Sequence, residues 1–210
     1  MGSRMKVLVI GATGATGKYA LPKLLAAGHD ITAFVRNPDT LPVRDARLRA
    51  VKGDARDGAA LAEAVKGQDA VLVMFGPRSL RRDDLQEVFM QNLVAAMEQH
   101  GVKRLVNLSA WGSSETRPFI SWVFLPFRMT LLKAVFDDKE RGEKILFASK
   151  LDYVNVSPAR LHDGPEKGAV VVAPDGKGVP NSISRADLAA WMIAQLGSDT
   201  WVRKSPIIGA

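Results

Sequence analysis

The chain of 210 residues carries a net charge of +7, contains no cysteine, and is 47% hydrophobic and 24% charged. This composition is typical of one packed domain and excludes a disordered or collagen-like chain. The lack of cysteine excludes a disulfide scaffold, thiolate catalysis and cysteine-ligated metal centres, and three histidines far apart in sequence suggest no metal site.

Short apolar runs alternate with segments of helical periodicity along the first half of the chain. Residues 5–10 (MKVLVI) are almost wholly apolar, which is typical of a strand buried on both faces of a parallel sheet. Apolar residues recur at helical spacing over 15–27, and Gly28 supplies a stop signal. Further strands are expected at 31–35, 49–52, 70–75 and 104–108, and helices at 58–66 and 83–100. This order predicts an α/β fold, a doubly wound, mostly parallel Rossmann-type sheet with helices on both faces.

The second half is less regular. We expect a helix over about 127–150, strands at 153–157, 170–172 and 205–208, and a helix over 185–196 capped by Ser184. Loops rich in Gly and Pro at 163–167 and 174–180 suit the substrate side of a site. Residues 1–4 precede a second methionine and look like an expression leftover, so a single domain is expected over residues 5–210.

A glycine motif, GATGATG at residues 11–17, follows the first strand and opens the first helix. In that context Gly11 permits a tight turn, Gly14 lets the backbone approach a pyrophosphate, and Gly17 allows the helix to pack closely on the strand. The threonines add hydroxyl donors. The expected cofactor contacts of this turn are Gly11, Thr13, Gly14, Ala15, Thr16 and Gly17. The alternative is a glycine turn that holds no ligand.

The end of the second strand indicates which dinucleotide binds, because the adenosine ribose lies there in this fold. An Asp or Glu is absent and Arg36 is present, and a guanidinium binds a 2′-phosphate, so we expect NADP(H) to be favoured over NAD(H). Arg36 as an ordinary surface residue is the alternative. Asp54 and Ala55 follow the third strand and are expected beside the adenine; alternatively, Asp54 caps the helix that begins near Gly58.

With these residues, the sequence resembles the atypical short-chain dehydrogenase/reductase superfamily, in its NmrA-like and biliverdin-IXβ reductase/flavin reductase branch. The resemblance covers nearly the whole chain. The matching stretches are residues 11–17, 35–36, 53–54, 67–70, 76–78, 95–97, 100–102, 137–138, 153–154, 157–158 and 183–188. It implies an NADPH-binding domain in which Phe75, Gly76 and Arg78 line the cofactor, Ser109 lies beside the nicotinamide, Lys139 lies near the ribose, and Pro158, Ala159, Arg160 and Leu161 form a back wall.

The sequence departs from the superfamily at its proton donor. Many members use a Tyr-x-x-x-Lys pair in which the tyrosine protonates a carbonyl oxygen. If Lys139 is that lysine, the tyrosine position is Val135, and Tyr153 does not fit the pattern because the residue four positions later is Ser157. Ordinary alcohol/ketone chemistry is therefore disfavoured. The biliverdin- and flavin-reducing relatives that the sequence resembles also lack that tyrosine and pass hydride from NADPH to a flat conjugated acceptor.

Ser109, Lys139 and Arg160 are the candidate catalytic residues. The biliverdin- and flavin-reducing relatives have a Thr-Ser pair where this chain has Ser109-Ala110, and a histidine where it has Arg160. An arginine there would suit an acceptor with a carboxylate or phosphate, such as FMN. The alternatives are that Ser109 only ends a strand and that Arg160 forms a structural ion pair.

Six of the fourteen aromatic residues lie in segment 111–136, after the fifth strand. They are expected to roof a planar substrate, to form a dimer face, or to join the core.

The leading hypothesis is thus an NADPH-dependent reductase of a conjugated small molecule. The competing one is a non-catalytic NADP(H)-binding redox sensor of the NmrA type. Residues 1–56 hold ten Lys or Arg against four Asp or Glu but few aromatics, so a nucleic-acid partner is not expected. We also expect a cytoplasmic monomer or homodimer without a membrane span, because Pro126, Arg128 and Lys133 interrupt the most apolar stretch.

Overall fold

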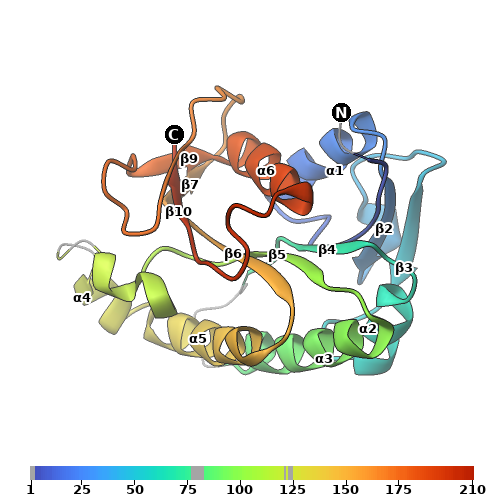
Figure 1. The fold of residues 1–210 in the computed structure, drawn as a ribbon, viewed down its shortest axis with the longest axis horizontal. Helices are drawn as coiled ribbons and strands as arrows, with labels where there is room; N and C mark the ends of the chain where they lie inside the picture. Colours follow the sequence, from blue (N-terminus) through green and yellow to red (C-terminus); the bar gives the residue numbers. More distant parts are fainter. Residues whose placement is uncertain (1–2, 77–82, 121, 123–124) are drawn as a thin grey trace.

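A computed structural model describes residues 3–76, 83–120, 122 and 125–210 of the chain. The strands of its main sheet run in the order β3-β2-β1-β4-β5-β6-β10-β8 (Figure 1). In sheet order they are β3 (Leu48–Lys52), β2 (Asp30–Val35), β1 (Lys6–Ile10), β4 (Ala70–Val73), β5 (Arg104–Leu108), β6 (Asp152–Pro158), β10 (Ile207–Gly209) and β8 (Val171–Ala173). All neighbours pair in parallel except β10 and β8. The predicted doubly wound, mostly parallel sheet is therefore confirmed.

Helices cover both faces of this sheet (Figure 1). α1 (Gly17–Ala26) and α6 (Arg185–Ala194) lie on one face, and α2 (Gly58–Val65), α3 (Leu85–His100) and α5 (Lys133–Ala148) lie on the other. Successive residues of β1 alternate between the two cores: Val7 and Val9 pack toward α1 and α6, whereas Leu8 and Ile10 pack toward α2 and α3. A strand with two buried faces has to be apolar throughout, which explains the run at 5–10.

Parallel pairing brings the carboxyl ends of the central strands to one edge of the sheet. Ile10 of β1 is paired with Phe34 of β2 and with Val73 of β4, and Val73 is paired with Asn107 of β5. The chain winds outward in opposite directions from β1 and β4. Ligands of open α/β sheets bind where the winding reverses, so this edge is where the site is expected.

The helix predicted over about 127–150 is confirmed only in its later part, because two helices occupy this region. α4 (Leu125–Met129) ends before α5 begins at Lys133. The buried side chain of Arg128 donates to the carbonyl oxygen of Gly112 at 2.8 Å and pairs with Glu140 of α5. In one continuous helix, residues twelve positions apart would lie about 18 Å apart along the axis, so this pair requires the break.

The C-terminal half also contains a small sheet that the sequence pattern did not predict. β7 (Arg160–His162) pairs with β9 (Ser182–Ser184) in parallel. The residues expected to form a back wall, 158–161, comprise the end of β6 and the start of β7. Three-residue strands show too little alternation to be recognised. The predicted cap is confirmed, since Ser184 accepts a hydrogen bond from the Asp187 N–H at 3.0 Å.

No helix in the described ranges has the length and apolarity to cross a membrane.

Candidate dinucleotide-binding site

The glycine turn after β1 has no room for larger residues. Gly11 has φ +86°, and a Cβ on it would lie 2.7 Å from the carbonyl carbon of Met74. The Gly14 N–H donates to the Gly11 carbonyl at 2.9 Å and closes the turn. A Cβ on Gly17 would lie 2.2 Å from that same carbonyl oxygen, so only glycine lets α1 start this close to the strand. The backbone is thus free to approach an anion at the helix N-terminus.

The other residues of the turn differ in their exposure. α1 begins at Gly17 rather than at Ala15, because residues 14–16 form the turn itself. Ala15 is exposed, whereas Thr16 is buried and its side chain makes no capping hydrogen bond. Thr13 lines the adjoining pocket. Thr13 is therefore the better placed of the two threonines to reach a ligand.

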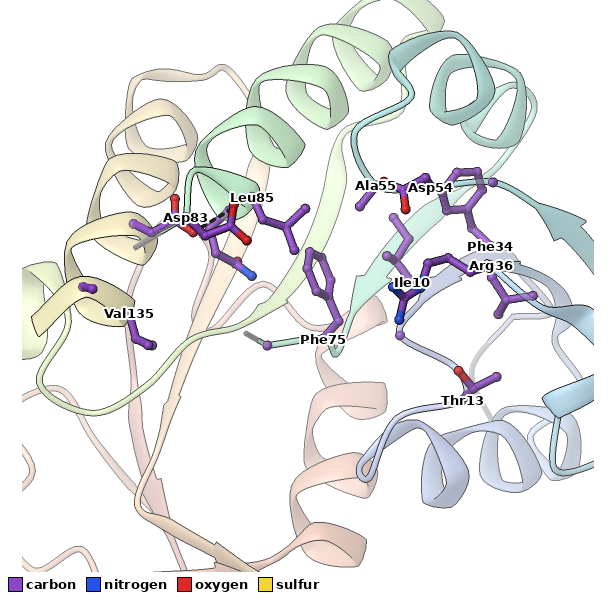
Figure 2. Close-up of a pocket in the computed structure, with 17 residues that line it drawn as sticks. Ile10, Thr13, Phe34, Arg36, Asp54, Ala55, Phe75, Asp83, Leu85 and Val135 are labelled. Carbon is purple, nitrogen blue, oxygen red and sulfur yellow. Dashed lines mark hydrogen bonds between the residues drawn. The ribbon is translucent and has the colours of Figure 1, made fainter. Parts of the chain in front are cut away.

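A pocket of about 300 Å³ crosses the carboxyl edge of the sheet (Figure 2). Its first half is formed by residues at the ends of β1, β2 and β3: Ile10, Gly11, Thr13, Phe34, Val35, Arg36, Gly53, Asp54 and Ala55. Phe75 and Gly76 lie between the halves. The second half is formed by the starts of α3 and α5: Asp83, Leu85, Gln86, Ala134, Val135 and Asp138. Small-molecule sites have volumes of this order.

The first half contains the residues predicted to recognise adenosine. Arg36 is exposed, and its side chain extends from the end of β2 toward Ile10 (Figure 2). It has no ion pair with any described residue. Asp54 accepts a hydrogen bond from the Arg56 N–H at 2.9 Å. It does not cap α2, because Asp57 accepts from the Ala60 N–H at 3.0 Å and is the cap.

Phe75 stands at the middle of the pocket, between Leu85 and Ile10 (Figure 2). The edge-to-face contact of its ring with Phe89 on α3, with 4.7 Å between centroids, holds it there. Phe75 and Gly76 were predicted to line a cofactor, and both line the pocket. Arg78 lies outside the described residues.

In the second half of the pocket, only Val135 and Asp138 were singled out from the sequence. The carboxylate of Asp138 accepts hydrogen bonds from the N–H groups of Gln86 and Glu87, at 3.0 and 3.3 Å, and so satisfies the start of α3. One signal could have revealed these residues. A helix that follows a strand starts at the carboxyl edge of the sheet, which places residues 83–86 at the same edge as the glycine turn.

Ser109 belongs to a buried polar network and does not line the pocket. Its hydroxyl donates to the carboxylate of Glu143, which also accepts from the Ser113 hydroxyl at 2.6 Å and from Asn155 Nδ2 at 3.1 Å. All four side chains are at most 6% exposed. Since its proton is directed to Glu143, the Ser109 oxygen has its lone pairs left for another donor.

Lys139 is also buried and outside the pocket. Its ammonium group donates to the carbonyl oxygen of Leu108 at 3.3 Å. Burial lowers the pKa of Lys139, and the charges of Glu143 and Asp138 offset part of this effect. Val135, one turn earlier on α5, does line the pocket, at the position where a tyrosine would be expected.

Residues 158–161 run from the last residue of β6 through Ala159 to the first two residues of β7, and none of them lines the pocket. Ala159 is buried and donates its N–H to the carbonyl of Ile208 at 2.9 Å. Arg160 is exposed, and its N–H donates to the Asn181 carbonyl at 3.2 Å. Within the described ranges its guanidinium has no ion-pair partner, so the structural ion pair considered for it is not seen.

A family model described as NAD(P)H-binding matches residues 11–199. This chain belongs to that NAD(P)H-binding family. The family match begins at Gly11, the first glycine of the turn, and includes every residue of the pocket except Ile10. The glycine turn and nearly all of the pocket thus lie within the region that matches the family.

Curated proteins similar to this chain include an uncharacterised protein and a reductase. An uncharacterised chloroplastic protein of Arabidopsis thaliana is 32% identical over 205 residues, which are 88% of this chain and 69% of that protein. A (4-alkanoyl-5-oxo-2,5-dihydrofuran-3-yl)methyl phosphate reductase of Streptomyces griseus is 35% identical over 109 residues. That match covers 52% of this chain and 36% of the reductase, so the chain spans about a third of its length.

Solved structures share the fold over almost their full length. A short-chain dehydrogenase/reductase of Veillonella parvula, in complex with NADP, has a TM-score of 0.82 at 19% identity, covering 99% of this chain and 95% of that one. ChuY, an anaerobilin reductase of Escherichia coli O157:H7, has a TM-score of 0.81 at 20% identity, covering 97% and 96%. At these identities the likeness is one of fold.

Proposed function

We propose that this protein is an NADPH-dependent reductase of a flat conjugated acceptor, such as a flavin, a quinone or a biliverdin-like tetrapyrrole. The observation that carries the proposal is the pocket itself. It runs from the glycine turn and Arg36 to Val135, where no hydroxyl is available as an acid. When bound, NADPH would supply the hydride, and water would supply the proton that the reduced acceptor takes up. A conjugated acceptor tolerates this arrangement because its reduction depends mainly on orientation and stacking.

The preference for NADPH over NADH is supported by Arg36. Its guanidinium is exposed and unpaired among the described residues, at the end of the strand where the adenosine ribose of the fold lies. The one acidic residue that the described chain places in the first half of the pocket is Asp54, and it follows β3, whereas Arg36 follows β2. A 2′-phosphate would therefore meet a cation and no opposing carboxylate there.

Ser109 and Lys139 are proposed to position the nicotinamide end. Because the Ser109 hydroxyl donates to Glu143, the serine is suited to accept a hydrogen bond from a carboxamide and is poorly suited to supply a proton. Lys139 lies beside the end of β5 and would approach the ribose. Arg160 is exposed on β7 outside this pocket, so we propose that it contacts an anionic group of the acceptor that extends beyond the pocket.

A second candidate function, a redox sensor that binds NADP(H) and a protein without turnover, is favoured by one observation. Five large apolar side chains of one segment are exposed: Phe119, Trp122, Phe127, Met129 and Leu131, with Trp122 83% exposed. Exposed apolar patches often mark interaction surfaces. The same surface would serve a homodimer of the reductase.

Steady-state oxidation of NADPH, followed by the loss of its absorbance, tests the proposal. The acceptors are FMN, FAD, menadione, a carbonyl-free dye and biliverdin, and NADPH and NADH affinities are measured in parallel by fluorescence titration. Turnover with one of these acceptors, together with tighter binding of NADPH than of NADH, is the expected result. Tight NADPH binding without turnover on any acceptor would favour the sensor, and binding of neither dinucleotide would refute both functions.

A further inference from the structure

The second half of the pocket contains a buried hydrogen-bond donor without a partner. Gln86 lies in the first turn of α3, is 7% exposed and lines the pocket. Its side-chain nitrogen, Nε2, has no hydrogen-bond partner in the described structure. Buried donors of native proteins are almost always satisfied, because leaving one unpaired is costly. A donor of this kind in a pocket points to a ligand that supplies the acceptor.

The backbone of Gln86 is held on both sides, which fixes where its side chain starts. Its N–H donates to Asp138 at 3.0 Å. On the other side, α5 approaches so closely that a Cβ on Gly142 would lie 2.7 Å from the Gln86 carbonyl oxygen. A shift of the helix therefore cannot carry Gln86 away from the pocket.

The other polar groups of this half are already engaged. Asp138 accepts from the start of α3 and from Arg141 at 3.2 Å. Asp83 pairs with Arg56 and accepts from the Asp84 N–H at 2.8 Å. Ala134 and Val135 are apolar. Gln86 is thus the uncommitted side-chain donor that the described residues offer to a ligand in this half.

We propose that Gln86 Nε2 donates a hydrogen bond to a carbonyl oxygen of the acceptor, which lies against Phe75. The inference rests on the proposed reductase function and deepens it, because it names the acceptor class as planar conjugated carbonyl compounds. Phe75 offers a flat apolar surface at the middle of the pocket (Figure 2). Val135 offers no hydroxyl, so the amide is the group that recognises the oxygen there.

The test compares Gln86→Met with Gln91→Met. Methionine matches glutamine in length and removes only the amide, and Gln91 is an exposed glutamine of the same helix. Each variant is assayed with menadione, a quinone with two carbonyl groups, and with phenazine methosulfate, a planar acceptor without a carbonyl. For Gln86→Met we expect the KM for menadione to rise about ten-fold or more, corresponding to the loss of one buried hydrogen bond. The KM for phenazine methosulfate and the Kd for NADPH should stay within about two-fold of wild type. Gln91→Met should change none of the three quantities.

Three results would overturn the proposal. A rise in the Kd for NADPH would assign the amide to the dinucleotide, and equal losses with both acceptors would assign it a structural role. Unchanged kinetics with menadione would show that the amide does not bind the acceptor. Gln86→Glu, which replaces the donor with an acceptor of the same shape, should weaken menadione binding in the same direction and serves if the methionine variant folds poorly.

The failure of the proposed function can be told apart from failure of this inference. If wild type turns over none of the acceptors, calorimetric titration of menadione into the protein with NADP⁺ still measures binding. Loss of menadione affinity in Gln86→Met and Gln86→Glu, with retention in Gln91→Met, would support the role of Gln86 without turnover. Equal affinity in all four proteins would overturn it.

Discussion

The hydroxyl of Ser109, just after β5, donates a hydrogen bond to the carboxylate of Glu143 on α5. Both side chains are buried, at 6% and 2% exposure. Two more donors, from Ser113 and Asn155, converge on the same carboxylate. Glu143 thus joins the end of β5 and the middle of the neighbouring strand β6 to helix α5, and it determines which way the Ser109 hydroxyl faces.

Replacing Glu143 by leucine should lower the free energy of unfolding by about 3 kcal/mol, because three buried donors lose their acceptor. Urea denaturation measures the effect. Glu63→Leu, at an exposed position of α2, is the matched control and should change stability by no more than about 0.5 kcal/mol. A Glu143→Leu protein as stable as the control would show that the network contributes little.

Arg36→Ala should weaken NADPH binding about ten- to hundred-fold, because a charge-assisted contact to the 2′-phosphate contributes about 1.5–3 kcal/mol. The affinity for NADH, which lacks that phosphate, should be unchanged. Fluorescence titration with both dinucleotides measures the two constants. Arg49→Ala, at an exposed arginine of β3, controls for the loss of one positive charge. Equal losses for NADPH and NADH would contradict the role assigned to Arg36.

Gly17→Ala should destabilise the fold by about 2 kcal/mol and weaken dinucleotide binding, since the new Cβ would collide with the backbone of Gly11 and Ala12. Backbone atoms cannot yield as a flexible side chain can. Gly197→Ala is the control, because a Cβ there meets nothing within 4 Å and its φ is not positive. Thermal unfolding measures the stability, and NADPH titration measures the affinity. If Gly17→Ala matched wild type in both quantities, the turn would be able to adjust to the added Cβ.

Lys139→Met should change how stability depends on pH. Burial lowers the pKa of Lys139 in the folded protein below the ordinary lysine value, about 10.4. Between the two pKa values the unfolded chain binds a proton that the folded chain does not, so the contribution of Lys139 to the free energy of unfolding rises with pH. Below that window the buried charge destabilises the fold, and the methionine variant should be the more stable protein.

Urea denaturation from about pH 7 to about pH 10 measures the free energy of unfolding of wild type and of Lys139→Met. The difference between the two free energies should narrow as the pH rises. Lys144→Met, at an exposed lysine of α5, is the control. Its free energy of unfolding should change with pH at the same slope as that of wild type. Parallel curves for wild type and Lys139→Met would mean that the burial of Lys139 does not affect its titration.

Much of the fold and half of the site follow from local patterns. A strand buried on both faces has to be apolar, and the turn packed closely between Met74 and α1 requires glycine. The strand and turn of residues 5–17 could therefore be predicted from the sequence. Arg36, Asp54 and Phe75 line the pocket as expected because each follows a strand that ends at the carboxyl edge of the sheet. The break between α4 and α5 was not predictable, since it depends on Arg128 reaching Gly112 and Glu140.

The sequence by itself therefore determined the α/β fold, the glycine turn and the candidate dinucleotide site at one edge of a parallel sheet. Only the tertiary structure decided which side chains share the pocket. It brought Gln86 and Val135 into the pocket and tied Ser109 to Glu143 outside it. The physical reason is that strand and turn preferences act between neighbours in sequence. The convergence of α3 and α5 on one pocket depends on how helices far apart in the chain pack over the same face of the sheet.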